Sequence, residues 1–231
     1  MDELNIKIIA RIKSDFPHKF GIPRQSGLLS KLLSTIVFEQ EYRNPDALRG
    51  LEGFSHLWLL WIFSENIRDT WNPTVRPPRL GGNKRLGVFA TRSSFRPNPL
   101  AMSCVKIEKV ILNSPIGPQI VVSGADLMDN TPIVDIKPYL PYADSIPHAV
   151  GGFAENVPQN KLKVVILPEL QKKIDASSIP VEKFQTLLEI LSQDPRPAYQ
   201  KNPDRVYGFS FAGLNIKFQV QNETLNVVDI S

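Results

Sequence analysis

The 231-residue chain contains a single cysteine and only three histidines. Cys104 has no partner for an intrachain disulfide, which is typical of proteins of a reducing cytoplasm. His18, His56 and His148 are widely separated in the sequence, and they form no zinc-ligand spacing with the cysteine. The scarcity of these residues excludes a disulfide scaffold, and it leads us to expect no metal centre.

The signatures of several common enzyme sites are also missing. The sequence has no Gly-x-Gly-x-x-Gly after a strand, no P-loop and no Gly-x-Ser-x-Gly elbow. Its most apolar stretch, residues 54–63, falls far short of the ~20 residues that a membrane-spanning helix requires. The first residues carry acids and no long apolar region, unlike a signal peptide. We therefore expect a cytoplasmic protein without a Rossmann fold, an ATPase site or a membrane span.

Positive charge is concentrated in one part of the chain. Residues 68–96 contain one acid, Asp69, and seven bases: Arg68, Arg76, Arg79, Lys84, Arg85, Arg92 and Arg96. Because the whole chain has a net charge of +4, the remainder carries −2. Such a segment predicts an anionic partner, with phosphate the first candidate, although a solvated basic loop would have the same composition.

The apolar pattern predicts a mainly β protein. Ile6, Ile8 and Ile12 indicate one strand, and Asn44-Pro45 indicates the capped start of a short helix. Residues 64–83 predict a long loop. Further strands are expected at residues 32–39, 54–63, 85–91, 100–112, 119–123 and 133–136. Several short strands with turns between them indicate a β-barrel or a sandwich.

The character of the chain changes after residue 160. Residues 143–160 lose the pattern and predict a linker. Beyond it we expect a helix at 181–191, hairpin turns at Ala212-Gly213 and Asn222-Glu223, and strands at 163–167, 206–211, 215–221 and 225–230. These predict two domains, 1–150 and 160–231, of which the second is a small α+β domain.

Three segments combine polar side chains with prolines: FGIPRQ at 20–25, TRSSFRPNPL at 91–100 and ADLMDNTPIVDIKPYL at 125–140. Prolines stiffen the backbone, so Arg24, Arg92 and Arg96 are expected to project from rigid loops. Arginine in such a loop suits a carboxylate or a phosphate, but it can equally satisfy the carbonyl groups of its own loop. Asp129 precedes a turn in which Asn130 is expected to be left-handed, and its carboxylate can bind a ligand or close the turn.

These segments resemble the TsaA-like family, which includes a bacterial tRNA methyltransferase. The stretches that carry the resemblance span nearly the whole chain: FGIPRQ, RGLEGFSHLWLLWIF, NPTVRPPRLGGNKRLGVFATRSSFRPNPLAMS, DNTPIVDIKPYLPYADS and LSQDPRPAY. The resemblance implies a single-sheeted β-barrel as the main domain, a homodimer, and S-adenosyl-L-methionine as methyl donor. The implied substrate is N6-threonylcarbamoyladenosine at position 37 of a threonine tRNA, which receives a methyl group on N6.

The resemblance also implies which residues bind the donor. These are Pro23, Arg24, Gln25, His56, Leu57, Arg92, Leu100, Asp126, Leu127, Met128 and Asp129. The chain departs from the family at Asn130, where members often carry glycine. Asparagine is the next most tolerant residue at a positive φ angle, so we expect the turn to survive. If the turn were lost, the contact of Asp129 would be the one in doubt.

Methylation of N6 requires the proton on that nitrogen to be removed or the group to be polarised. The candidates for a protein base are Asp129, Asp135, Tyr139 and Tyr142, of which Asp135 and Tyr139 are preferred. Alternatively, the carboxylate of the substrate itself assists.

The basic segment is expected to hold the anticodon stem-loop through Arg76, Arg79, Lys84 and Arg85. Arg196 and Tyr199 are expected to contact the same RNA or to support the dimer. Two other functions remain open from the sequence: a small-molecule methyltransferase that uses the same donor site, and a non-catalytic RNA-binding module.

Overall fold

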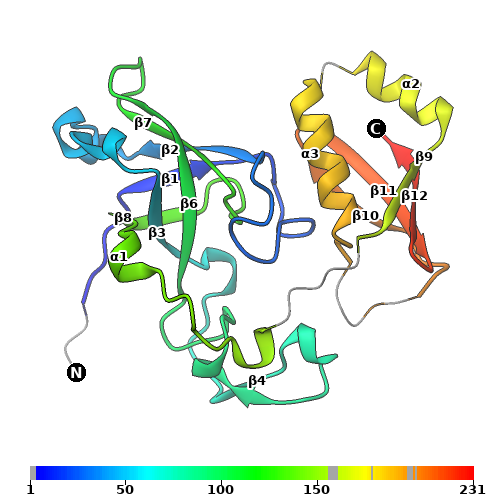
Figure 1. Cartoon of the computed structure of the whole chain (residues 1–231), viewed down its shortest axis with the longest axis horizontal. Coiled ribbons are helices and arrows are strands. Elements are labelled where there is room, and N and C mark those ends of the chain that lie inside the picture. The colour runs from blue at the N-terminus through cyan, green and yellow to red at the C-terminus, as the bar shows by residue number, and fades with distance from the viewer. Residues whose placement is uncertain (1–3, 156–160, 178, 197–199, 201) are drawn as a thin grey trace.

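The computed structural model describes residues 4–155, 161–177, 179–196, 200 and 202–231. Its first part is a closed barrel in which every pair of neighbouring strands is antiparallel (Figure 1). In spatial order the strands are β1 (Ala10–Lys13), β2 (Leu33–Phe38), β7 (Gln119–Ser123), β6 (Leu100–Ile111), β3 (His56–Ile62) and β8 (Pro132–Pro138). The prediction of a mainly β protein with a single-sheeted barrel is confirmed.

Alternation along the strands fills the interior of the barrel. In β3 the side chains of Leu57, Leu59 and Trp61 are buried, and the residues between them are partly exposed. In β6 the buried face carries Ser103 and Val105. Because successive side chains of a strand point to opposite faces, one apolar residue in two is enough to build this core.

Outside its strands, the first part of the chain contains short helical turns. They are the 3-10 helices η1 (Gln40–Tyr42), η2 (Pro45–Leu48), η3 (Leu51–Gly53), η4 (Ser64–Asn66), η5 (Pro78–Leu80), η6 (Val88–Ala90) and η7 (Gly152–Ala154), and the short helix α1 (Pro141–Asp144). The side chain of Asn44 accepts a hydrogen bond from the backbone of Asp46 at 3.0 Å, so the predicted cap is present on a 3-10 turn.

Two strand predictions in the first part need correction. The strand expected around Ile6 begins only at Ala10, where the pairing with Phe38 of β2 starts, and Ile6 is exposed. The strand expected at 85–91 is limited to β5 (Leu86–Gly87), which pairs with β4 (Thr74–Val75). The chain then turns, because both the backbone N–H and the hydroxyl of Thr91 donate to the carbonyl of Val88.

The second part is a four-stranded sheet with two helices, α2 (Pro168–Ala176) and α3 (Val181–Ser192). The strand order is β10 (Tyr207–Phe211), β11 (Leu214–Gln221), β12 (Thr224–Ile230) and β9 (Lys163–Ile166), with only β9 and β12 parallel among these pairs of the described chain. The predicted hairpin turns are confirmed by positive φ angles of 50° at Ala212 and 54° at Asn222. Helix α2 was not predicted, because it buries only Leu170 and Ile174, too few residues for a clear period.

The loop between β1 and β2 joins the core of the second part. Phe16, Leu29 and Leu32 are buried in the same cluster as the side chains of β10 to β12. The ring centroids of Phe16 and Phe211 are 5.1 Å apart. This early loop therefore packs against the sheet of the second part and shares its apolar core.

Candidate active site at the rim of the barrel

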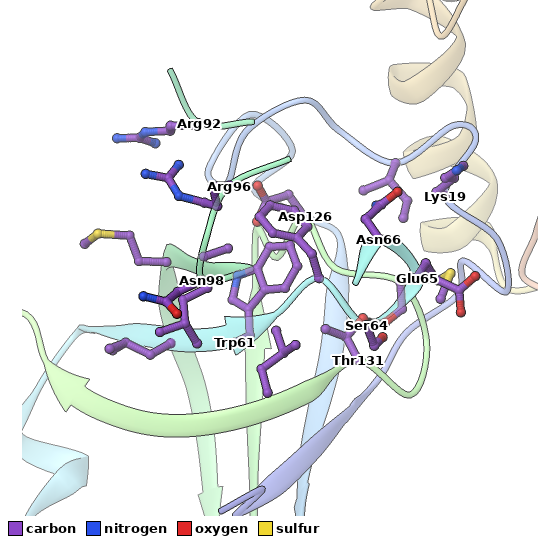
Figure 2. A pocket seen from close by; sticks show the side chains of 18 of the residues that line it. Lys19, Trp61, Ser64, Glu65, Asn66, Arg92, Arg96, Asn98, Asp126 and Thr131 are labelled. Carbon is purple, nitrogen blue, oxygen red and sulfur yellow. Dashed lines mark hydrogen bonds between the residues drawn. The ribbon is translucent and has the colours of Figure 1, made fainter. Parts of the chain in front are cut away.

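An open cavity of about 800 Å³ lies at the end of β3, next to the start of β6 (Figure 2). Its lining comes from residues 19–25, 60–66, 89–102 and 126–131, which belong to separate parts of the sequence. All three segments that combine polar residues with prolines contribute to it. The volume lies in the range of small-molecule sites, which are concave and carry a few well-placed polar groups.

Most of the predicted donor-binding residues meet at this cavity. Pro23, Arg24, Gln25, Arg92, Leu100, Asp126 and Met128 all line it. These residues come from three loops and one strand. The closure of the barrel brings the loops and the end of the strand together. The cavity is therefore the place where the predicted set can act jointly.

The other predicted donor-binding residues do not line this cavity. Leu57 and Leu127 are buried in the barrel core. His56 stands at the first position of β3, and the cavity lies at the other end, roughly 20 Å away at the rise of a β-strand. The carboxylate of Asp129 accepts a hydrogen bond from the backbone of Ser14 at 3.0 Å and lies 3.8 Å from the ammonium of Lys13.

The turn after Asp129 has the predicted conformation. Asn130 has a φ angle of 64°, so it occupies the left-handed region that glycine would otherwise fill. The backbone N–H of Asp129 donates to Phe16 at 2.8 Å, and that of Asn130 donates to Ile12 at 2.8 Å. The departure from the family pattern at this position therefore leaves the turn intact.

A chain of hydrogen bonds orients Asp126 at the cavity. The indole N–H of Trp61 donates to the hydroxyl of Ser103 at 3.0 Å, and this hydroxyl donates to Oδ1 of Asp126 at 2.5 Å. Because an indole nitrogen can only donate, the proton of Ser103 is directed towards the carboxylate. Neither Trp61 nor Ser103 was among the predicted site residues, and their contact becomes visible only through the pairing of β3 with β6.

Burial sets the chemistry of this carboxylate. It raises the pKa of Asp126 above its ordinary value, and the hydrogen bond from Ser103 offsets only part of the effect. A carboxylate removed from water in this way is stabilised by a positively charged ligand group. Asp126 thus provides a site for a cation inside the cavity.

The arginines of the cavity differ in what they hold. Arg92 donates to the side-chain oxygen of Gln25 at 2.6 Å, and Arg24 donates to the carbonyl of Arg196 at 2.9 Å. Arg96 donates to the carbonyls of Thr91 and Ser93, so it fastens its own loop. A guanidinium has five N–H donors, so Arg92 and Arg24 keep donors that can reach an anionic ligand group.

The predicted bases lie elsewhere. Asp135 forms an ion pair with Lys137 at 2.9 Å, and Tyr139 packs against the rings of His56 and Trp58. Tyr142 is 87% exposed, and none of the three lines the cavity. Among the residues that the structure describes, the carboxylates that line the cavity are Asp126 and Glu65, of which Asp126 is partly buried and Glu65 is exposed.

The predicted RNA-binding residues divide into two groups. Arg76, Arg79, Lys84 and Arg85 are exposed on the segment that contains β4 and β5. Arg196 is buried and forms two hydrogen bonds of 2.8 Å with Asp194, which gives it a structural role. Tyr199 lies outside the described residues.

Within the described ranges, no group of three or more His, Cys, Asp or Glu side chains is placed to hold a metal ion. No helix in the same ranges has the length and apolarity needed to cross a membrane.

Comparisons with known proteins agree with these features. A Pseudomonas aeruginosa protein named as an S-adenosylmethionine-dependent methyltransferase is 37% identical over 233 residues, which cover 98% of this chain and 97% of that protein. A crystal structure of TrmO from Pseudomonas aeruginosa superimposes with a TM-score of 0.78 and 30% identity, covering 100% of this chain and 99% of that one.

An Escherichia coli K12 protein named tRNA (adenine(37)-N6)-methyltransferase is 40% identical over 234 residues, which cover 98% of this chain and 97% of that protein. The model of the tRNA-methyltransferase O N-terminal domain matches residues 11–145. The model of the TrmO C-terminal domain matches residues 159–231. Together with the barrel and its cavity, these matches show that the chain belongs to the tRNA-methyltransferase O family.

Proposed function

We propose that the protein transfers a methyl group from S-adenosyl-L-methionine to N6 of adenosine 37 in tRNA. The finer proposal is that this nucleoside is N6-threonylcarbamoyladenosine in a threonine tRNA. The observation that carries the proposal is the cavity itself, which combines the partly buried carboxylate of Asp126, the donors of Arg24 and Arg92, and an adjoining basic segment. The names of the relatives and the family models support it.

The residues of the cavity fit the donor chemically. S-adenosyl-L-methionine carries an ammonium, a sulfonium and a carboxylate, and it supplies an activated methyl group when bound. Asp126 provides the anion for one of the positive groups, and Arg92 or Arg24 provides N–H donors for the carboxylate. The partly apolar lining, including Leu100 and Met128, is available to the uncharged parts of the donor.

The main task of the protein is to position the two reactants. Methyl transfer is an in-line displacement, and correct alignment supplies up to ~7–11 kcal/mol of the barrier in favourable cases. Stiff loops serve this purpose. Pro23 restricts the backbone next to Arg24, and Arg96 ties its loop to the carbonyls of Thr91 and Ser93.

The identity of the proton acceptor can be tested directly. Asp135 and Tyr139 are the bases that the sequence favours, but both lie outside the cavity. We therefore expect Asp135→Asn and Tyr139→Phe to retain methylation rates within about threefold of wild type, whereas loss of a general base typically costs about 10²–10⁴-fold. Rates in this narrow range would remove Asp135 and Tyr139 from consideration as the base. A loss of a hundredfold in either variant would instead establish that residue as the base.

The function itself can be tested with labelled donor. The purified protein is incubated with labelled S-adenosyl-L-methionine and bulk tRNA from a strain that lacks this protein. Label is expected in threonine tRNA, and only when the threonylcarbamoyl group is present. Turnover without RNA would indicate a small-molecule methyltransferase. RNA binding without any affinity for the donor would indicate a binding module, and either result would overturn the proposal.

The basic segment gives a further prediction. Affinity falls as the salt concentration rises, so the slope of log affinity against log salt concentration is negative. We expect Arg76→Ala and Lys84→Ala each to make this slope less steep by about one, because each removes one phosphate contact. Binding of the anticodon stem-loop is measured over a series of salt concentrations. Lys109→Ala, on the barrel strand β6, serves as the control. An unchanged slope in both variants would show that the segment does not contact the RNA backbone.

The proposal includes a cytoplasmic homodimer that binds the anticodon stem-loop. These three features follow from the resemblance to the family and from the proposed tRNA substrate. The oligomeric state can be measured by light scattering of the purified chain.

A further inference from the structure

Two exposed aromatic rings lie beside the cavity, outside the predicted set of site residues. Phe89 is 73% exposed and Trp71 is 49% exposed, yet their ring centroids are only 6.1 Å apart with an interplanar angle of 32°. Phe89 lines the cavity, and Trp71 lines a small neighbouring hollow that shares Asn66 and Arg96 with it. The pair thus presents flat apolar surface to solvent at the mouth of the cavity, where it is available to a ligand.

Backbone pairing holds the two rings close to each other. Trp71 precedes β4 and Phe89 follows β5, and the two strands pair at Thr74 with Gly87. The N–H of Val88 also donates to the carbonyl of Pro73 at 2.9 Å. These backbone hydrogen bonds join the residues that follow Trp71 to the residues that precede Phe89, so the fold of this segment holds the two rings near each other.

The surroundings of the rings are positively charged. The guanidinium of Arg68 lies 4.2 Å from the ring centroid of Phe95, in the same hollow as Trp71. Throughout the part of the chain that is described, no ion pair within 4.0 Å engages Arg68, Arg92 or Arg96. Exposed aromatic rings beside arginines that form no ion pair are typical of surfaces that bind single-stranded nucleic acid, where bases stack on the rings and phosphates pair with the positive charge.

We propose that Trp71 and Phe89 form a stacking platform for an unpaired base of the anticodon loop, next to the adenosine that enters the cavity. The inference rests on the proposed function and adds to it the place where the loop is held. Phosphate contacts alone would not distinguish a loop from a duplex, whereas stacking requires an unpaired base. The platform therefore explains how a basic surface can prefer a loop.

The test compares two RNAs of equal charge. Full-length wild type, Trp71→Ala, Phe89→Ala and Trp71→Phe are titrated with an anticodon stem-loop RNA and with a fully paired RNA duplex of the same number of phosphates. We expect both alanine variants to bind the stem-loop about tenfold more weakly and the duplex within about twofold of wild type. Trp71→Phe keeps an aromatic face and should retain affinity. The salt slopes should not change, because no phosphate contact is removed.

The control is Phe54→Ala, which removes a 38% exposed ring that precedes β3, at the end of that strand away from the cavity. It should bind both RNAs like wild type. Equal weakening for stem-loop and duplex, or no weakening in either alanine variant, would overturn the platform. Because Phe89 lines the cavity and Trp71 does not, the affinity of Trp71→Ala for S-adenosyl-L-methionine reports whether the cavity is intact. If the wild type methylates tRNA but the alanine variants bind the stem-loop as it does, only this inference is overturned. If the wild type does not methylate tRNA, the proposed function is overturned.

Discussion

Asp126→Asn should weaken the binding of S-adenosyl-L-methionine by about tenfold to a hundredfold, as expected for the loss of a hydrogen bond to a charged group. The substitution keeps an oxygen that accepts the proton of Ser103, so the chain of hydrogen bonds from Trp61 is preserved. What it removes is the negative charge inside the cavity. Isothermal titration calorimetry with the purified proteins measures the effect.

The affinity should also depend on pH in wild type and not in the variant. The pKa of Asp126 is raised by burial above the ordinary value of 3.8. A cationic ligand prefers the ionised carboxylate, so wild-type affinity should increase as the pH rises through this pKa and then level off. Glu65→Gln is the matched control, because Glu65 lines the same cavity but is exposed. An equal loss of affinity in Glu65→Gln would contradict a specific role for Asp126.

The same substitution should stabilise the protein in the absence of ligand. Because the folded pKa of Asp126 is raised, the folded state holds its proton when the unfolded chain has already lost it. Stability is therefore lost as the pH rises from about 3.8 through the folded pKa, and Asp126→Asn avoids this loss. The melting temperature of the variant should exceed that of wild type at neutral pH. The difference should become smaller as the pH is lowered towards about 3.8. A lower melting temperature at neutral pH would show that the carboxylate is compensated by its hydrogen bonds.

Gly21→Ala should lower the free energy of unfolding by roughly 2–5 kcal/mol, from the sum of backbone strain and overpacking. Gly21 has a φ angle of 91°, in the left-handed region. A Cβ atom on it would lie 2.6 Å from Cδ2 of Phe209, a buried ring that also contacts Phe20 and Phe218. Urea unfolding of both proteins gives the difference.

The effect should extend to the cavity, because the residues that follow Gly21 line it. We expect weaker binding of S-adenosyl-L-methionine in the variant at a temperature where it remains folded. Gly50→Ala is the matched control, since Gly50 has a φ angle of 88° but no atom within 4 Å of the added Cβ. It should show only the cost of the backbone conformation, ~1–2 kcal/mol. Equal destabilisation by the two substitutions would mean that Phe209 moves aside freely.

Regular strands were the easiest features to predict. Strand β7 has the predicted bounds, and β6 ends one residue before the predicted end. Alternation is a local property, because it depends only on which face of the strand is buried. The turn at Asn130 was predictable for a similar reason, since its φ angle depends on the residue type and its immediate neighbours.

The site was predicted only in part. The segments that carry Arg24, Arg92 and Asp126 were identified, but the sequence did not indicate that Leu127 points into the core or that Asp129 binds the backbone of Ser14. Arg196 shows the limit most clearly. A charged residue between prolines suggests an exposed loop, yet the side chain is buried against Asp194. Whether a polar residue faces a ligand or satisfies its own loop depends on neighbours that are remote in the sequence.

The sequence by itself determined the strand pattern, the left-handed turns, the concentration of positive charge in residues 68–96 and, through its resemblance to a family, the chemistry to expect. The tertiary structure decided which of the candidate residues share a cavity, how Trp61 and Ser103 support Asp126, and that Trp71 lies against Phe89. The physical reason is the closure of the barrel. Neighbours in its strand order, such as β3 and β8, are far apart in the chain, so distances across the rim depend on the pairing of whole strands.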